Sequence, residues 1–152
     1  MSNPYFEMIV LIERLHRRFL DIVRIELNKL GIRDINAPQA LMLANIGDSE
    51  ILVRDLVERG YYLGQNVNYS IRKLVEYGYL TQERDEHDKR AVRVSLTEKG
   101  RELVPEIRKI DHLEHVAASD QPVEEEELEQ IVTTLRKVER CWAEYVQFRP
   151  YV

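Results

Sequence analysis

The chain of 152 residues lacks several features on which particular classes of protein depend. It contains a single cysteine, Cys141, which excludes an intramolecular disulfide framework and fits a reducing environment. No apolar run approaches the length of a membrane-spanning helix, and the first residues do not form the hydrophobic region of a signal peptide. These absences predict a soluble, cytoplasmic protein without a membrane partner.

Sequence motifs for catalysis and cofactor binding are also missing. The chain has no Gly-rich phosphate loop, no CxxC pair and no Ser-His-Asp order. His112 and His115 are spaced to share one helical face and can form a metal-binding pair, but the sequence fixes no third ligand. We interpret them as surface histidines, and Cys141 as a core or interface thiol rather than a redox sensor. We expect neither an enzyme nor a bound cofactor or metal.

Negative charge predominates, but it is unevenly distributed. The net charge is −5, from 22 Lys and Arg against 27 Asp and Glu. Residues 54–93 carry 8 basic against 7 acidic side chains, a net of +1, whereas residues 97–152 carry 8 against 13, a net of −5. DNA contact requires local rather than global positive potential. The acidic balance of the chain therefore permits DNA binding by its middle segment.

Helix signals predict a mainly α-helical chain. Asn3-Pro4 and Asn36-Ala37-Pro38 are good helix starts, because asparagine caps a helix and proline is tolerated in its first turn. Apolar residues at three-four spacing follow the first start, and glycines at 31 and 60 suit helix ends. We expect helices that begin near residues 4, 36, 49, 64, 97 and 122, the third carrying Leu52, Leu56 and Val57.

The fourth of these helices has two chemically distinct faces. Val67, Ile71 and Leu74 fall at i, i+4 and i+7, so we expect them to face the core. The other side is polar and nearly uncharged. Asn, Gln and Arg are side chains that read the edges of DNA bases. The exposed candidates are Gln65, Asn66, Asn68, Tyr69, Arg72 and Lys73.

A pair of strands with a charged loop follows this helix. Residues 79–84 and 91–96 alternate in the manner of strands, with Val92, Val94 and Leu96 on one face. The loop 85–90 contains basic residues that can reach a neighbouring DNA groove. Helices followed by such a hairpin predict a winged helix-turn-helix, and hence DNA binding.

Residues 56–59, 74–80 and 83–100 resemble the MarR family of transcriptional regulators. The family's wing reads Arg-Asp-Pro-x-Asp-Arg-Arg, followed by a strand that ends in Leu-Thr-x-x-Gly. The residues that match in order and spacing are Arg84, Asp85, Asp88, Arg90, Leu96, Thr97 and Gly100. The chain departs from the family at Glu86, where proline is common, and at Gly64-Gln65-Asn66, where the recognition helix is usually rich in Ser and Thr. These departures predict a familiar mode of binding to a different operator sequence.

The resemblance covers essentially the whole chain and implies its organisation. The expected fold is mainly α with a small two- to three-stranded β wing, forming one domain over residues 1–152. Within it, residues 36–97 form the winged helix-turn-helix lobe, and residues 4–30 and 98–148 form dimerisation helices. The long terminal helices carry apolar stripes that a second copy can cover, which places two recognition helices on successive turns of the major groove.

Side-chain chemistry, supported by the resemblance, gives a role to each candidate DNA-binding residue. Gln65, Asn68, Tyr69 and Arg72 are expected in the major groove, while Asn66 and Lys73 contact phosphates. Arg90 is expected to enter the minor groove. Asp88 can hold the Arg90 guanidinium in place, or the two can form a simple exposed ion pair. Arg84 and Lys89 are expected as phosphate or structural partners.

The function implied is a sequence-specific regulator, in the first place a repressor, that binds double-stranded operator DNA as a homodimer. In the family a small aromatic or phenolic effector commonly releases the DNA. His16 lies on the apolar stripe of the first helix, where a core histidine is the default interpretation. Alternatively, it lines an effector cleft with Met42, Asn45, Tyr61 and Tyr62. The competing function is a helical protein-interaction adaptor that shares the fold but does not bind DNA.

Overall fold

The computed structural model describes residues 3–60, 64–110 and 118–148 of the chain. It divides into two compact units, Met1–Ile110 and Asp111–Val152, which are described separately below. Within the described part, no helix combines the length and the apolar character needed to cross a membrane.

The first two helices begin where their capping residues predict. Helix α1 spans Pro4–Lys29, and the side chain of Asn3 accepts a hydrogen bond of 3.0 Å from the Tyr5 amide. Helix α2 spans Ala37–Ile46 and begins with a capping box. Asn36 accepts from the Gln39 amide at 2.9 Å, and Gln39 accepts from the Asn36 amide at 3.0 Å. Two backbone amides at the start of α2, which have no acceptor within the helix, thereby gain hydrogen-bond partners.

The third predicted helix begins later than expected, because its first residues form a strand. Ile51–Leu52 is strand β1, and helix α3 covers Val53–Gly60. Ile51 pairs with Val94 and Leu52 with Arg93, so the backbone bonds of this segment go to the hairpin. The placement of Leu52 in a helix was therefore wrong. Pairing with a distant strand outweighs local helix signals here.

The hairpin completes a three-stranded antiparallel sheet in the order β1-β3-β2. Helix α4, Gly64–Glu76, precedes strand β2, Leu80–Arg84, and strand β3 covers Val92–Leu96. The register pairs Leu80 with Leu96 and Arg84 with Val92. Gly78 provides the positive φ of +84° that turns the chain from α4 into β2. The fold class predicted from the sequence, mainly α with a small β wing, is confirmed.

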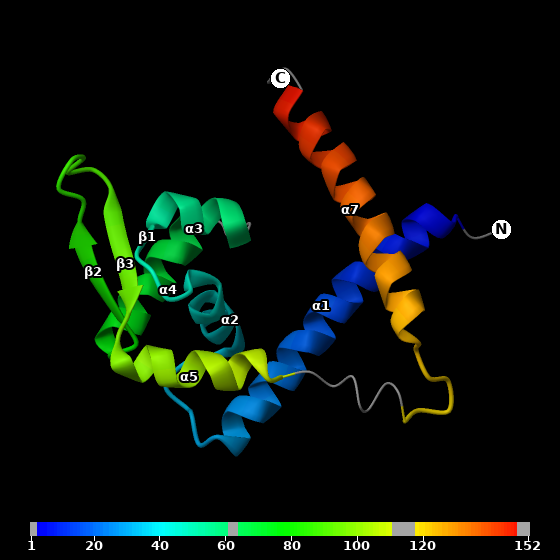
Figure 1. Ribbon diagram of the computed structural model, residues 1–152, viewed down its shortest axis with the longest axis horizontal. Coiled ribbons are helices and arrows are strands. Elements are labelled where there is room, and N and C mark those ends of the chain that lie inside the picture. The colour runs from blue at the N-terminus through cyan, green and yellow to red at the C-terminus, as the bar shows by residue number, and fades with distance from the viewer. Residues whose placement is uncertain (1–2, 61–63, 111–117, 149–152) are drawn as a thin grey trace. The chain divides into compact units, whose positions relative to one another are not determined.

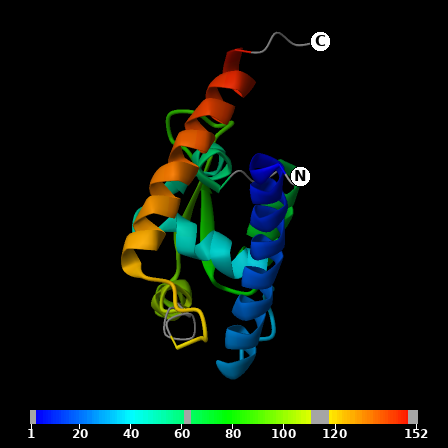
Figure 2. The ribbon, with the colours of Figure 1, turned by 90° about the vertical axis from the view of Figure 1, so that its right-hand side faces the viewer.

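The core of the first unit gathers around α2, whose residues are buried on most sides. Its members come from every element of the unit, and α1 contributes through its C-terminal half, where Figure 2 shows α2 beside it. Largest among the fully buried side chains are Leu43, Leu56, Leu74 and Leu80. The winged lobe thus has a continuous apolar centre that fixes the positions of α4 and the hairpin.

Helix α5, Glu98–Arg108, follows the hairpin and packs against α2 (Figure 1). Thr97 caps it by accepting a hydrogen bond of 3.2 Å from the Gly100 amide. Leu103, Val104 and Ile107 are buried against the lobe, as their spacing predicts. Continuation of this apolar stripe beyond residue 110 lies outside the described residues.

The apolar stripe of α1 is only half covered. Val23 and Leu27 are buried in the core, whereas Ile12 and Phe19 remain 38% and 40% exposed. His16 is exposed as well, so the interpretation of a core histidine within its own subunit is wrong. The stripe runs past the end of the lobe, and its N-terminal half has no partner within the first unit.

The second unit consists mainly of helix α7, Glu125–Phe148, with three glutamates in its first turn. Negative charge is favourable at a helix N-terminus, so these glutamates stabilise the start of the helix. None of the described residues of α7 is buried, and several large apolar side chains on it are exposed: Ile131, Val132, Val146 and Phe148.

Candidate nucleic-acid interface

Helix α4 presents its polar face to solvent because its apolar face is locked in the core. Val67, Ile71 and Leu74 are 0%, 3% and 0% exposed, which confirms the predicted wheel. Asn66, Asn68, Tyr69 and Arg72 are exposed on the remaining surface. Gln65 is the second residue of the helix, and its side chain lies outside the described part.

Lys73 occupies a different chemical environment from the other candidates on α4. Its ammonium lies 3.4 Å from Glu76 Oε2 and 5.9 Å from the centre of the Tyr69 ring. The hydrogen bond with Glu76 raises the pKa of Lys73 above its ordinary value. Lys73 is therefore partly engaged on its own helix, in keeping with an expected phosphate contact rather than base reading.

The tip of the wing is shaped by Asp88 acting on the backbone. Asp88 Oδ1 accepts a hydrogen bond of 3.0 Å from the Arg90 amide, and the Ala91 amide donates to the Asp88 carbonyl at 2.9 Å. Among the described residues, no carboxylate lies within ion-pair distance of the Arg90 guanidinium. Neither predicted form of the Asp88–Arg90 pair is present among the described contacts, in which the Asp88 carboxylate closes the turn instead. The Arg90 side chain remains available to a ligand.

The base of the wing is fixed by an ion pair that sequence reasoning missed. Arg93 Nε donates to Asp85 Oδ1 at 2.9 Å, and its other end lies 3.7 Å from Glu50 Oε2. The hydrogen bond lowers the pKa of the Asp85 carboxyl and raises the pKa of the Arg93 guanidinium. The Asp85 amide also donates to the Ala91 carbonyl at 2.9 Å. No sequence spacing reveals this pair, because it depends on the register of the hairpin.

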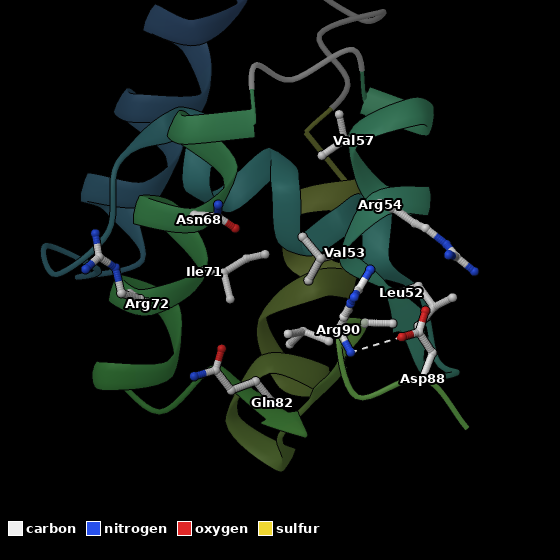
Figure 3. Close-up of a pocket in the computed structure, with 12 residues that line it drawn as sticks. Leu52, Val53, Arg54, Val57, Asn68, Ile71, Arg72, Gln82, Asp88 and Arg90 are labelled. Atoms are coloured by element: carbon white, nitrogen blue, oxygen red, sulfur yellow. Dashed lines mark hydrogen bonds between the residues drawn. The ribbon is translucent and has the colours of Figure 1, made fainter. Parts of the chain in front are cut away.

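A groove of about 590 Å³ separates α4 from α3 and the wing (Figure 3). Asn68 and Arg72 of α4 lie on one side of it, and Arg54 of α3 and Arg90 of the wing lie on the other, with Ile71 and Val53 between them; Gln82 of β2 lies below Ile71. The groove brings together four residues predicted independently on the helix and the wing: Asn68, Arg72, Asp88 and Arg90. These segments are 16 or more residues apart in sequence, so the fold assembles one polar surface from both.

Other predicted DNA-binding residues lie beside this groove rather than in it. Asn66 and Tyr69 are exposed elsewhere on α4, and Arg84 and Lys89 are exposed on the wing. Two polar groove residues were not predicted to bind DNA, Arg54 at the start of α3 and Gln82 on β2. The position of Gln82 could have been predicted from the sequence. It lies two residues after buried Leu80 in the same strand, and residues at this spacing point to the same face of a sheet.

The residues predicted for an effector site are dispersed. His16 and Asn45 are exposed on α1 and α2, whereas Met42 is 3% exposed and packs in the core. Tyr61 and Tyr62 lie outside the described residues, as do His112 and His115. In the part of the chain that the structure describes, no three potential metal ligands are grouped.

The surface can bind a polyanion that also presents hydrogen-bonding edges. Exposed guanidiniums of Arg54, Arg72 and Arg90 surround the groove, and none of them has an ion-pair partner among the described residues. Asn68 and Gln82 add amide groups that both donate and accept. Guanidiniums next to amides suit a phosphate backbone with base edges beside it.

Comparison with known proteins gives matches along most of the chain. Residues 35–100 match a model of the winged helix DNA-binding domain. Over 144 residues the chain is 35% identical to the exopolysaccharide II synthesis transcriptional activator ExpG of Rhizobium meliloti (strain 1021), covering 95% of this chain and 74% of that protein.

Solved structures share the fold. The transcriptional regulator SlyA is similar with a TM-score of 0.78 at 24% identity, covering 93% of this chain and 97% of SlyA. A mutant MarR from E. coli complexed with operator DNA is similar with a TM-score of 0.71 at 22% identity, covering 90% of this chain and 99% of that one.

Proposed function

The chain belongs to the MarR family of winged helix-turn-helix transcriptional regulators, and we propose that it binds a pseudo-palindromic operator as a homodimer. In this proposal residues 36–97 form the DNA-binding lobe, and residues 4–30 and 98–148 form the dimerisation helices. Helix α4 enters the major groove and the wing enters the adjacent minor groove. The chain is a DNA-binding regulator rather than an enzyme.

One observation carries the proposal: helix and wing residues meet around a single groove. Asn68 and Arg72 of α4 line it together with Arg90 of the wing. Amides pair with adenine and guanidiniums with guanine, and each bidentate pair discriminates by about 1–3 kcal/mol. We assign Gln65, Asn68, Tyr69 and Arg72 to bases, Asn66 and Lys73 to phosphates, and Arg90 to the minor groove. Arg84 and Lys89 flank the wing as further phosphate contacts.

The proposed dimer is supported by apolar surface that the single chain leaves uncovered. On α1, Ile12, Leu15 and Phe19 are 38%, 63% and 40% exposed and share one helical face. Exposed contiguous apolar surface of this kind marks protein interfaces. A two-fold pair of subunits also matches the symmetry of a palindromic operator.

The sign of regulation separates two versions of the proposal. The family resemblance favours repression, whereas the similar protein from R. meliloti is described as an activator of exopolysaccharide II synthesis. A reporter fused to the bound promoter, measured with and without the chain, decides between them. Repression lowers expression when the chain is present, and activation raises it.

We also propose that a small aromatic or phenolic ligand releases the DNA. Exposed His16 on α1 and Asn45 on α2 are the described candidates for contact with it. A ligand can shift the equilibrium only through different affinities for the DNA-bound and free conformations. The His16→Ala variant should therefore need more ligand for release while retaining its affinity for DNA.

The central test is binding to the DNA upstream of the chain's own gene. Fluorescence anisotropy should show specific binding that weakens steeply with salt, and footprinting should show two half-sites one helical turn apart, about 10 bp. Arg72→Ala should lower affinity and relax specificity at one position of each half-site. A protein-interaction adaptor would show no difference between this DNA and an unrelated duplex, which would overturn the proposal.

A further inference from the structure

The structure places two polar side chains without an assigned role on the surface that we propose faces DNA. Arg54 is the second residue of α3, and Gln82 is in the middle of β2. Both line the groove that also contains Asn68 and Arg90. We propose that this groove holds the sugar-phosphate backbone of one DNA strand, where it passes from the major groove to the minor groove, and that Arg54 binds a phosphate there. The inference rests on the proposed function.

The position of Arg54 follows from the correction to the third helix. Strand β1 pairs with β3 through Leu52 and Arg93, so α3 starts directly beside the hairpin. Arg54 therefore lies next to the wing, on the same side of the groove as Arg90 (Figure 3). A helix that began several residues earlier, as the sequence suggested, would not have placed Arg54 at a strand end.

The charge of Arg54 has no partner within the described residues. Glu50, four residues earlier, is 3.7 Å from Arg93 and belongs to the wing-base ion pair. The Arg54 side chain is exposed, with no ion pair or hydrogen bond to a described residue. An unpaired guanidinium at the rim of a groove is suited to bidentate phosphate binding.

The floor of the groove suits the sugars of the same strand. Ile71 and Val53 lie between its two polar sides (Figure 3), and the apolar side chains that line the groove are Leu52, Val53, Val57, Ile71, Ala91 and Val92. They are well placed to contact deoxyribose rings while the walls bind phosphates and bases. The groove has a volume of about 590 Å³ and is lined by both α4 and the wing.

Gln82 of β2 supplies a neutral donor below Ile71 (Figure 3). Its partner across the sheet is Val94, so it points to the same face as buried Leu80 and Val94 and reaches the groove. An amide can donate to a phosphate oxygen without adding charge. Its replacement by a carboxylate, in Gln82→Glu, places negative charge against the proposed strand.

The test compares wild-type chain, Arg54→Ala, Arg54→Lys and Arg101→Ala on the upstream duplex and on an unrelated duplex. Arg101 is exposed on α5 and does not line the groove. Arg101→Ala therefore removes the same charge as Arg54→Ala but leaves the groove intact. Arg54→Ala should weaken binding to both duplexes by a similar factor of about tenfold or more. The slope of log affinity against log salt should fall by about 0.9 for each phosphate that the variant no longer neutralises.

The controls distinguish failure of this inference from failure of the proposed function. Arg54→Lys should retain the salt slope, and Arg101→Ala should match wild type. Gln82→Glu should weaken binding more than Gln82→Leu. If Arg54→Ala binds DNA with wild-type affinity and an unchanged salt slope, the inference about Arg54 is overturned while the proposed function stands. No specific binding by the wild-type chain would overturn the proposed function. Circular dichroism and the urea midpoint of each variant exclude unfolding as the cause.

Discussion

The hydroxyl of Tyr79 donates a hydrogen bond of 2.9 Å to Asp34 Oδ1, a residue 45 positions earlier in the chain. Lys99 lies over the Tyr79 ring at 4.3 Å from its centre, 3.5 Å from Asp34 Oδ2, and donates to the Tyr77 carbonyl at 2.8 Å. This cluster joins the α1–α2 connection, the end of α4 and the start of α5. It therefore fixes the C-terminal end of α4.

Tyr79→Phe should remove the hydrogen bond to Asp34 while keeping the buried ring. A hydrogen bond to a charged group contributes about 1.5–3 kcal/mol to stability. The Asp34 carboxylate is partly exposed, so water can replace part of the lost hydrogen bond. We expect a loss of about 1–2 kcal/mol in the free energy of unfolding, measured by urea denaturation. Tyr77→Phe, on an exposed ring nearby, is the control and should leave stability unchanged.

The same pair gives a prediction for pH. Burial and the hydrogen bond to Asp34 raise the pKa of Tyr79 to about 12 from its ordinary value of 10.0. Because the folded chain holds the phenol proton more tightly, this contribution is complete below pH 10 and is lost as pH rises toward 12. The difference in stability between wild type and Tyr79→Phe should therefore shrink over that interval. A difference that stays constant would show that the two states bind this proton equally.

Gly100→Ala should destabilise the lobe through a direct clash. A Cβ at this position would overlap the Tyr79 carbonyl oxygen and lie 3.1 Å from a Leu96 methyl. The Thr97 hydroxyl ties the start of α5 to the same segment by donating a hydrogen bond of 2.6 Å to the Gly78 carbonyl. Because the backbone must shift, we expect a loss of about 1–3 kcal/mol in the free energy of unfolding. Glu98→Ala, in the same helical turn, is the control, and equal stability of the two variants would contradict the packing argument.

Much of the lobe could be predicted from its sequence because local rules and packing agree there. The caps at Asn3, Asn36 and Thr97 and the buried stripe of α4 depend on near neighbours in the chain. By contrast, β1 depends on pairing with a strand more than 40 residues away, and Asp85 meets Arg93 only across the hairpin. Such contacts have no local signature, and for the same reason the sequence did not reveal that Arg54 lines the groove.

Asp88→Asn and Asp88→Ala should behave differently if the residue acts on the backbone. Asparagine retains an oxygen that can accept from the Arg90 amide, whereas alanine does not. We expect Asp88→Asn to bind DNA at least as tightly as wild type, because it also removes a negative charge near phosphate. Asp88→Ala should weaken binding by several-fold through loss of order at the tip. If Asp88 instead acted through the Arg90 guanidinium, both variants would lose affinity alike in an anisotropy titration.

Leu15→Glu should dissociate the proposed dimer. Leu15 is 63% exposed on α1 and lies between Ile12 and Phe19 on one helical face, so a second subunit would bury it. A carboxylate buried without a partner costs several kcal/mol, which corresponds to a dimer weakened by about 100-fold or more. Sedimentation equilibrium should then show the 18.0 kDa chain where wild type shows twice that mass.

The matched control places the same side chain on another face of α1. Arg17→Glu adds a carboxylate away from Ile12 and Phe19, and it should leave the dimer intact. Two half-sites require two recognition helices, so Leu15→Glu should also lose operator affinity. The melting temperature of the winged lobe should stay unchanged. A Leu15→Glu chain that remains dimeric would exclude this face of α1, and Val146→Glu on α7 would then test the exposed surface of the second unit.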